Sequence, residues 1–197
     1  MGFTVNNTIF IVGRSEIVAQ ANLPLISELF TTIGINNIRP DFDPTYTMFV
    51  DKSLDVVKNI TENNLKTTIL TTFSNAKNYT FTTPTKLFDI VFAGSDVTTP
   101  YTGKYLHYSG FTHDIAVSFA IKKRFQNVIL LGAADFTQRH YDNNTKFKCS
   151  DSLKGQSINF LENVCAKHCN LYTVNPASAL HIPRITLDDI IQEIYSG

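Results

Sequence analysis

The sequence predicts an α/β protein in which helices cover both faces of a mostly parallel sheet. Short apolar runs bounded by Gly, Pro or Asn are typical of buried strands, and several of the segments between them have apolar residues at helical spacing. Strands that alternate with helices are typical of βαβ units, whose strands lie parallel. The 197 residues contain no repeat, linker or low-complexity block. We therefore expect a single Rossmann-like, doubly wound domain over residues 1–197.

The first half of the chain is predicted to hold most of the strands. Residues 8–12 form an apolar run that ends at Gly13, which predicts a buried strand. Apolar residues then recur at helical spacing over residues 17–29, with Pro24 as the one interruption. The further elements predicted here are strands at residues 34–38, 46–50, 67–73 and 87–92 and a helix at residues 53–60.

The second half contains the clearest strand, residues 127–131, which is apolar throughout its centre and ends at Gly132. A helix is predicted just before it, because apolar residues recur at helical spacing over residues 111–125. The other predictions are loops at residues 94–104 and 137–150, helices at residues 152–167 and 187–195 and a strand at residues 171–174.

Composition and charge exclude several classes of protein. The chain has 17 Lys and Arg against 17 Asp and Glu, whereas a protein that coats nucleic acid non-specifically needs a basic surplus. No apolar run reaches the roughly 18 residues of a membrane span, and the N-terminal segment lacks the pattern of a signal peptide. Three cysteines form no disulfide framework. We expect a cytoplasmic protein with no membrane partner, and its excess of Asn and Thr is typical of AT-rich genomes such as those of phages.

Two short segments are candidate anion sites because each places Gly and Ser at a predicted helix start. Gly13-Arg14-Ser15 follows the first strand, and Ser109-Gly110 precedes the helix at residues 111–125. Backbone N–H groups at such a position favour a phosphate, as does the helix dipole, and Arg14 adds a cation. Both segments are also compatible with an ordinary turn and helix cap, and the sequence leaves the two interpretations open.

One carboxylate and two histidines are candidates for further chemistry. Asp135 follows the clearest strand, where a carboxylate holds a ribose, a metal or a neighbouring loop. His107 and His113 flank Ser109-Gly110, and each is a candidate either for catalysis or for a structural role. The Cys and His residues of the second half fit no common zinc spacing, so we expect no metal and no other cofactor.

Several short motifs, taken in chain order, resemble the bacterial lipooligosaccharide sialyltransferases. In the first half they are IFIVGRS at residues 9–15, INN at residues 35–37 and FVDKS at residues 49–53. In the second half they are YSG at residues 108–110, ILLGAADF at residues 129–136, INFLE at residues 158–162 and LYTVNPAS at residues 171–178. The Gly-x-Ser loop and the Gly–Asp segment are also similar to those of the 6-hydroxymethylpterin diphosphokinase-like proteins of the same superfamily. The resemblance implies a nucleotide-binding domain.

The same resemblance implies a nucleotide site built from strand ends and a helix start. The matching positions are Gly13, Arg14 and Ser15 for the phosphates, Asn36 or Asn37 and Asp51 for the nucleotide, and Ser109 and Gly110 for the base or ribose. Asp51 stands where the family has Asn. Asp135 joins this set as a candidate ligand of the ribose.

The catalytic positions implied by the resemblance lie in the second half. Tyr141 matches one of two tyrosines that stabilise the departing phosphate, and the family's catalytic histidine falls on Cys149. Because a thiol is a poor general base at neutral pH, the base is expected to come from Asp151, His140 or His113.

Three functions are compatible with these features. The leading one is transfer of a glycosyl group from a nucleotide-activated sugar, with a nucleotide or nucleotide sugar as the partner and self-association left open. The alternatives are a pyrophosphokinase-like phosphotransferase and a non-catalytic protein that binds or sequesters a nucleotide.

Overall fold

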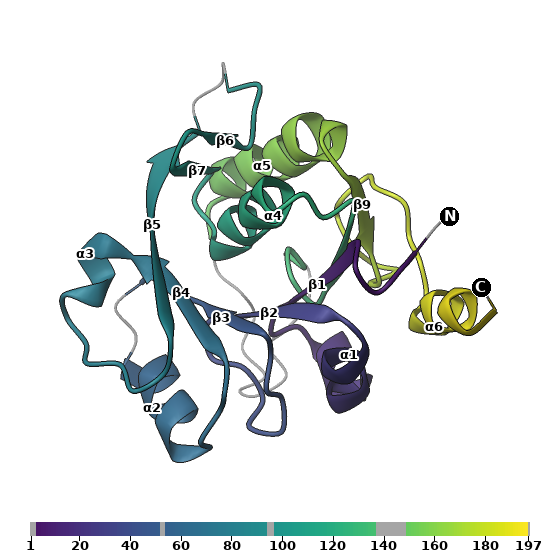
Figure 1. Cartoon of the computed structure of the whole chain (residues 1–197). Coiled ribbons are helices and arrows are strands. Elements are labelled where there is room, and N and C mark those ends of the chain that lie inside the picture. Colours follow the sequence, from purple (N-terminus) through teal and green to yellow (C-terminus); the bar gives the residue numbers. More distant parts are fainter. Residues whose placement is uncertain (1–2, 52–53, 94–96, 137–148, 197) are drawn as a thin grey trace.

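The computed structural model describes residues 3–51, 54–93, 97–136 and 149–196 and shows a central sheet between two layers of helices (Figure 1). The nine strands of the described residues pair in the order β6-β7-β5-β4-β3-β2-β1-β8-β9, and only β6 is antiparallel to its neighbour. They are β1 (Thr8–Val12), β2 (Thr31–Ile35), β3 (Tyr46–Met48), β4 (Thr68–Thr72), β5 (Thr85–Phe92), β6 (Tyr101–Thr102), β7 (Tyr105–Tyr108), β8 (Asn127–Leu131) and β9 (Asn170–Thr173). The predicted fold class is confirmed.

Helices connect most of the parallel strands. The α-helices are α1 (Leu23–Leu29), α2 (Leu54–Glu62), α3 (Phe73–Ala76), α4 (Thr112–Lys122), α5 (Asp151–Asn159) and α6 (Leu187–Ser196). Two 3-10 helices, η1 (Glu16–Gln20) and η3 (Cys165–Lys167), and one π-helix, η2 (Phe160–Val164), complete the list for the described residues.

The side chains of β1 alternate between two hydrophobic cores, one on each face of the sheet. Ile9 and Ile11 belong to the core that α4 and η2 cover, whereas Phe10 and Val12 belong to the core that α1, α2 and α6 cover. Every residue of β1 and of β8 is buried. Strands buried on both faces are typical of the centre of a parallel sheet, which explains why these two runs are the most apolar of the chain.

Local features explain the differences in bounds for two of the predicted elements. The segment predicted as one helix divides into η1 and α1 at residues 21–22, and Pro24 lies in the first turn of α1, where its missing N–H costs no hydrogen bond. The Asn22 side chain caps α1 by accepting a hydrogen bond from the Leu25 amide at 3.2 Å. The predicted strand at residues 34–38 runs instead from 31 to 35, because Asn36 adopts a left-handed backbone (φ 58°) that ends β2.

The predicted loop at residues 94–104 contains the start of a small hairpin. β6 and β7 pair in antiparallel fashion around Gly103, whose φ of +54° suits a tight turn. β7 also pairs in parallel with β5, so the hairpin extends the sheet.

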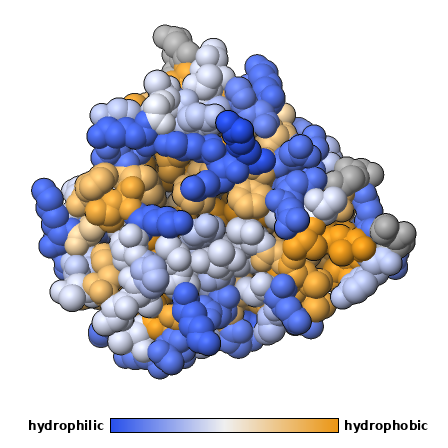
Figure 2. Space-filling view, in the orientation of Figure 1, coloured by the Kyte–Doolittle hydropathy of each residue, from blue (hydrophilic) through white to orange (hydrophobic). Residues whose placement is uncertain are grey.

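An exposed apolar patch lies over α3 and β5, on the left-hand side of Figure 2. The exposed large apolar side chains of these two elements are Phe73, Leu87, Val91 and Phe92. Among the described residues, none of the helices has the length and apolar character needed to cross a membrane.

Candidate functional site

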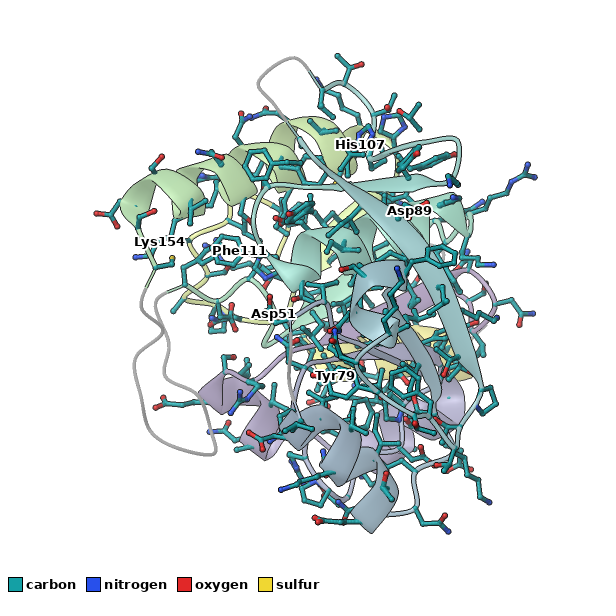
Figure 3. All side chains as sticks on the ribbon, turned by 90° about the vertical axis from the view of Figure 1, so that its left-hand side faces the viewer. Asp51, Tyr79, Asp89, His107, Phe111 and Lys154 are labelled. Atoms are coloured by element: carbon teal, nitrogen blue, oxygen red, sulfur yellow. The ribbon has the colours of Figure 1, made fainter. Side chains whose placement is uncertain are left out.

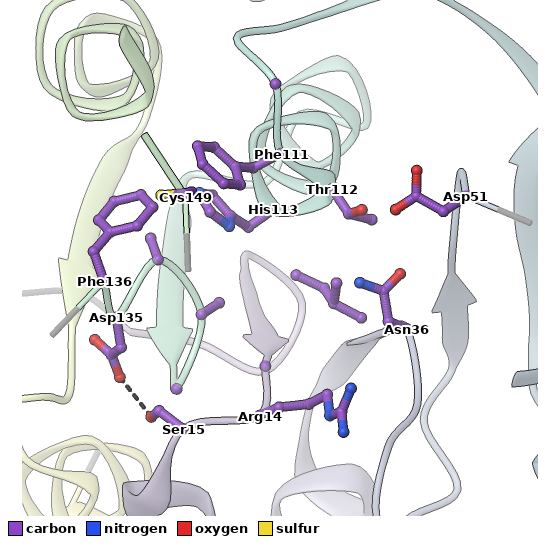
Figure 4. Close-up of a pocket in the computed structure, with 16 residues that line it drawn as sticks. Arg14, Ser15, Asn36, Asp51, Phe111, Thr112, His113, Asp135, Phe136 and Cys149 are labelled. Carbon is purple, nitrogen blue, oxygen red and sulfur yellow. Dashed lines mark hydrogen bonds between the residues drawn. The ribbon is translucent and has the colours of Figure 1, made fainter. Parts of the chain in front are cut away.

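A cavity of about 370 Å³ lies where the direction of the sheet's connections reverses. From β1 the chain proceeds through β2 to one edge of the sheet, and it later returns to β8 on the other side of β1. The loops after β1 and β8 therefore diverge and leave a crevice at the carboxyl ends of the strands, which is the usual ligand site of such sheets. Residues 13–15 and 132–136 line this cavity together with the start of α4 (Figure 4).

Two glycines allow the loops after β1 and β8 to touch. A Cβ on Gly13 would lie 2.1 Å from the carbonyl oxygen of Gly132, and a Cβ on Gly132 would lie 2.2 Å from the Val18 side chain. Gly132 also has a φ of +67°, a backbone conformation that favours glycine. The Ser15 amide donates to the Gly132 carbonyl at 3.3 Å. The floor of the cavity is consequently a close backbone contact between the two loops.

Ser15 and Asp135 form the polar side of this floor. The Ser15 hydroxyl donates to Oδ2 of Asp135 at 2.6 Å, and both side chains are buried. Burial raises the pKa of the Asp135 carboxyl, and hydrogen bonding from the side chains of Ser15 and Asn175 partly offsets this increase. Ser15 precedes only a five-residue 3-10 helix and makes no side-chain cap, so its hydroxyl serves Asp135.

A buried carboxylate that sequence reasoning missed organises the opposite wall. Asp114 is fully buried in the first turn of α4, where its Oδ2 accepts hydrogen bonds from the Ser109 amide at 3.1 Å and the Ser109 hydroxyl at 2.7 Å. The Phe111 amide also donates to Oδ2 at 3.4 Å, and the Ser157 hydroxyl of α5 donates to Oδ1 at 2.7 Å. An acidic residue at the third position of a helix is a capping signal, and this signal could have drawn attention to Asp114.

His113 lies in the cavity wall between two aromatic rings. Its ring stacks on Phe111, with centroids 5.0 Å apart and planes 7° from parallel, and forms a T-shaped pair with Phe136, with centroids 5.5 Å apart. Burial lowers the pKa of His113, and the Asp114 carboxylate acts in the opposite direction. The imidazole is therefore neutral at pH 7.

The tautomer of His113 follows from its hydrogen bond. Nε2 lies 3.0 Å from the Ser157 hydroxyl oxygen, and the single hydrogen of that hydroxyl is donated to Asp114. The hydroxyl oxygen must then accept a hydrogen from Nε2. Nδ1 is left as the ring nitrogen that can accept a proton, on a side chain that lines the cavity.

The structure brings most of the predicted nucleotide-site residues together. Arg14, Asn36, Asp51 and Gly110 line the same cavity as the Ser15–Asp135 pair, and Figure 4 shows Asn36 and Asp51 on the side away from Asp135. Ser109 is hydrogen-bonded to Asp114 behind Gly110 and does not line this cavity, and neither does Asn37.

The other residues predicted as the general base do not all lie at the cavity. Asp151 has a side chain that is 99% exposed, pairs with Lys154 at 3.3 Å and does not line the cavity. Figure 3 shows Lys154 on α5, to the side of Phe111 and Asp51. Cys149 lines the cavity, and burial raises the pKa of its thiol. His140 and Tyr141 lie outside the described residues, so their roles stay predictions.

His107, the second histidine near Ser109, contacts a backbone carbonyl away from the cavity. Nδ1 of His107 lies 2.7 Å from the Thr99 carbonyl oxygen, and the residue is buried outside the cavity. Within the residues that the structure describes, no three His, Cys, Asp or Glu side chains are grouped so that they could hold a metal ion.

Comparison with known proteins gives one solved structure of similar fold. No protein-family model and no curated protein matches the chain. The solved structure is the MAf glycosyltransferase from Magnetospirillum magneticum AMB-1, with a TM-score of 0.61 and 11% sequence identity. The chain shares the fold of a glycosyltransferase. The match covers 100% of this chain but 37% of the other, so the chain spans little more than a third of that protein.

Proposed function

We propose that this protein transfers a glycosyl group from a nucleotide-activated sugar that binds in the cavity between the loops after β1 and β8. The observation that carries the proposal is the place of this cavity, at the reversal point of a sheet whose fold is shared with a glycosyltransferase. The motifs that resemble the lipooligosaccharide sialyltransferases favour the same reaction, because most of them converge on this cavity.

The lining residues fit the parts of such a donor. Arg14 is the one Lys or Arg among the described lining residues and would face the phosphates. The Asp135 carboxylate, held by Ser15, is suited to hydrogen bonds from ribose hydroxyls. Asn36 and Asp51 offer both a donor and acceptors to the nucleoside on the other side of the cavity.

His113 is the general base of this proposal. Nδ1 takes the proton of an acceptor hydroxyl while the acceptor oxygen forms a bond to the anomeric carbon of the donor. The bond between that carbon and the phosphate oxygen breaks, and the nucleotide leaves with the electron pair. Ser157 and Asp114 hold Nε2 and stabilise the imidazolium that forms. The exposure of Asp151 and the raised pKa of Cys149 favour His113 over both.

The proposal is tested by incubating the protein with a panel of cytidine, uridine and guanosine nucleotide sugars and measuring hydrolysis and transfer. Release of a nucleotide from one class of donor, without added Mg²⁺, is the expected result. Magnesium-dependent release of AMP from ATP would instead favour a pyrophosphokinase. The absence of binding by any nucleotide at millimolar concentration would contradict nucleotide use altogether.

Non-catalytic nucleotide binding is the second candidate function, and one observation favours it. The resemblance places the catalytic histidine at Cys149, and burial keeps that side chain a neutral thiol at pH 7. Tight nucleotide binding with no hydrolysis, unchanged by His113→Ala, would support this function.

A further inference from the structure

Asp51, at the nucleoside end of the cavity, is held by a buried side chain that does not itself line the cavity. We propose that this side chain, Asn75 of α3, is a positioning residue for nucleotide recognition, because it holds Asp51 at the cavity. The inference rests on the proposed function, since it assigns Asn75 to the binding of the same nucleotide. Asn75 lies just beyond the carboxyl end of β4, two strands away from β2 in the sheet.

Asn36 and Asp51 both follow strands, but different contacts hold them. Asn36 comes directly after β2, and its amide donates to the Met48 carbonyl of β3 at 2.9 Å. Asp51 lies three residues beyond the end of β3 at Met48, and its carbonyl oxygen accepts a hydrogen bond from Nδ2 of Asn75 at 3.1 Å. Figure 4 shows the side chains of Asn36 and Asp51 at the cavity. The position of Asp51 relative to Asn36 therefore depends on a side chain of α3 as well as on strand pairing.

A buried network fixes the side chain of Asn75. Its Nδ2 group also donates to the Thr71 hydroxyl oxygen at 3.0 Å, and the Thr71 hydroxyl donates in turn to the Phe49 carbonyl at 2.8 Å. The backbone amide of Asn75 donates to the Thr72 hydroxyl oxygen at 3.1 Å, which caps α3. The two hydrogens of one amide group thus both serve the segment at residues 49–51, one directly and one through Thr71.

The remaining polar atom of the Asn75 side chain has no partner. Oδ1 is buried and accepts no hydrogen bond from the residues that the structure describes. A buried acceptor without a donor lowers stability, and an apolar side chain of similar size avoids that cost. Asparagine at this position is therefore explained by its donors, and the segment that they hold ends at the cavity.

The test is a double-mutant cycle in the full chain, because a positioning residue acts through the residue that it holds. The 5′-diphosphates of adenosine, cytidine, guanosine and uridine are first compared by calorimetry, and the one that binds most tightly is used for the cycle. Asn75→Ala is expected to raise its Kd about tenfold in the wild-type background but less than about twofold in the Asp51→Ala background. A purely structural role of Asn75 would instead change the Kd by the same factor in both backgrounds.

Thr71→Val and Thr47→Val are a matched pair of further variants. Each removes the hydroxyl of a fully buried threonine and keeps the size of the side chain. The Thr71 hydroxyl accepts from Asn75, whereas the Thr47 hydroxyl lies 3.0 Å from the hydroxyl of Thr67. Thr71→Val should raise the nucleotide Kd about threefold or more, and Thr47→Val should leave it unchanged. Urea unfolding checks that both variants are folded.

The possible results separate the role of Asn75 from the proposed function. Equal loss of affinity in the two backgrounds would overturn the inference, as would equal weakening by Thr71→Val and Thr47→Val. If Asn75→Ala does not fold, Thr71→Val in the same two backgrounds decides. If none of the nucleotides binds at millimolar concentration, the proposed function and this inference are both wrong. If a nucleotide binds but no glycosyl group is transferred, the proposed function alone fails, and the cycle still decides the role of Asn75.

Discussion

His113 lies where its surroundings determine both its charge and its tautomer. Burial between Phe111 and Phe136 lowers its pKa, and the hydrogen bond to Ser157 assigns the hydrogen to Nε2. A neutral imidazole with Nδ1 available is the form that a general base needs at neutral pH. His113 is thus the candidate base whose protonation state is set by the fold.

Replacement of His113 by Ala is expected to lower transfer by about 100-fold, because general base catalysis contributes at least this much. Nucleotide affinity should stay unchanged, since the ring acts on the acceptor. The matched control is Asp151→Ala, which removes an exposed carboxylate outside the cavity and should keep transfer near the wild-type level. Steady-state kinetics measures the rate of transfer, and calorimetry measures the nucleotide affinity. A larger loss for Asp151→Ala than for His113→Ala would contradict the assignment.

The lowered pKa of His113 predicts a dependence of stability on pH. The unfolded chain has a histidine of pKa about 6.5, so between this value and the lower folded value the unfolded state binds more protons. Stability is therefore complete above about pH 6.5 and is lost as the pH falls through the folded pKa. Denaturant unfolding of the wild type and of His113→Gln, from neutral to acidic pH, measures how the free energy of unfolding of each protein changes with pH. An equal decline in both proteins would show that His113 is not responsible.

At the scale of elements, the loops after β1 and β8 depend on glycine for their contact. Gly132 has a left-handed backbone, and its missing side chain makes room for Val18 and Ser15. Gly103 in the β6–β7 turn has a similar φ but no atom within 4 Å of a Cβ. An alanine at Gly132 would therefore introduce both backbone strain and steric overlap, whereas an alanine at Gly103 would introduce backbone strain alone.

Gly132→Ala is expected to lower the free energy of unfolding by about 3 kcal/mol, from backbone strain and overlap together. Gly103→Ala should cost about 1 kcal/mol, because only strain applies. Urea unfolding of both variants gives the comparison. Equal losses would mean that the loops after β1 and β8 are not in tight contact.

Asp114 joins α4, α5 and the Ser109-Gly110 segment through a single carboxylate. Asp114→Ala would leave the buried hydroxyls of Ser109 and Ser157 without their acceptor, and we expect stability to fall by about 3 kcal/mol. Asp114→Asn keeps the size of the side chain and should cost less. Thermal and urea unfolding measure both. A loss below about 0.5 kcal/mol for Asp114→Ala would show that the network is not structural.

At the scale of the whole molecule, the order of the strands places the site. β1 and β8 were the clearest apolar runs in the sequence, and they are the two strands whose loops form the cavity. Their prediction is secure because a strand buried on both faces needs apolar residues throughout. The bounds of β2 were missed because they depend on the backbone of Asn36.

The site was only partly predictable for a similar reason. Gly13, Ser15 and Asp135 follow strands, so the topology of a parallel sheet was enough to suggest them. Asp114 acts through Ser109 and Ser157, residues that only the folded chain brings together. The exposure of Asp151 likewise depends on how α5 packs, which no local pattern reveals.

The most direct measurement is a crystal structure of the protein with the nucleotide that it binds best. Binding of a nucleotide-activated sugar between β1 and β8 predicts that the phosphates lie beside Arg14 and the ribose beside Asp135, within the cavity that residues 13–15 and 132–136 line. A nucleotide bound elsewhere on the molecule would contradict this site. The absence of any bound nucleotide at millimolar concentration would contradict the proposed function itself.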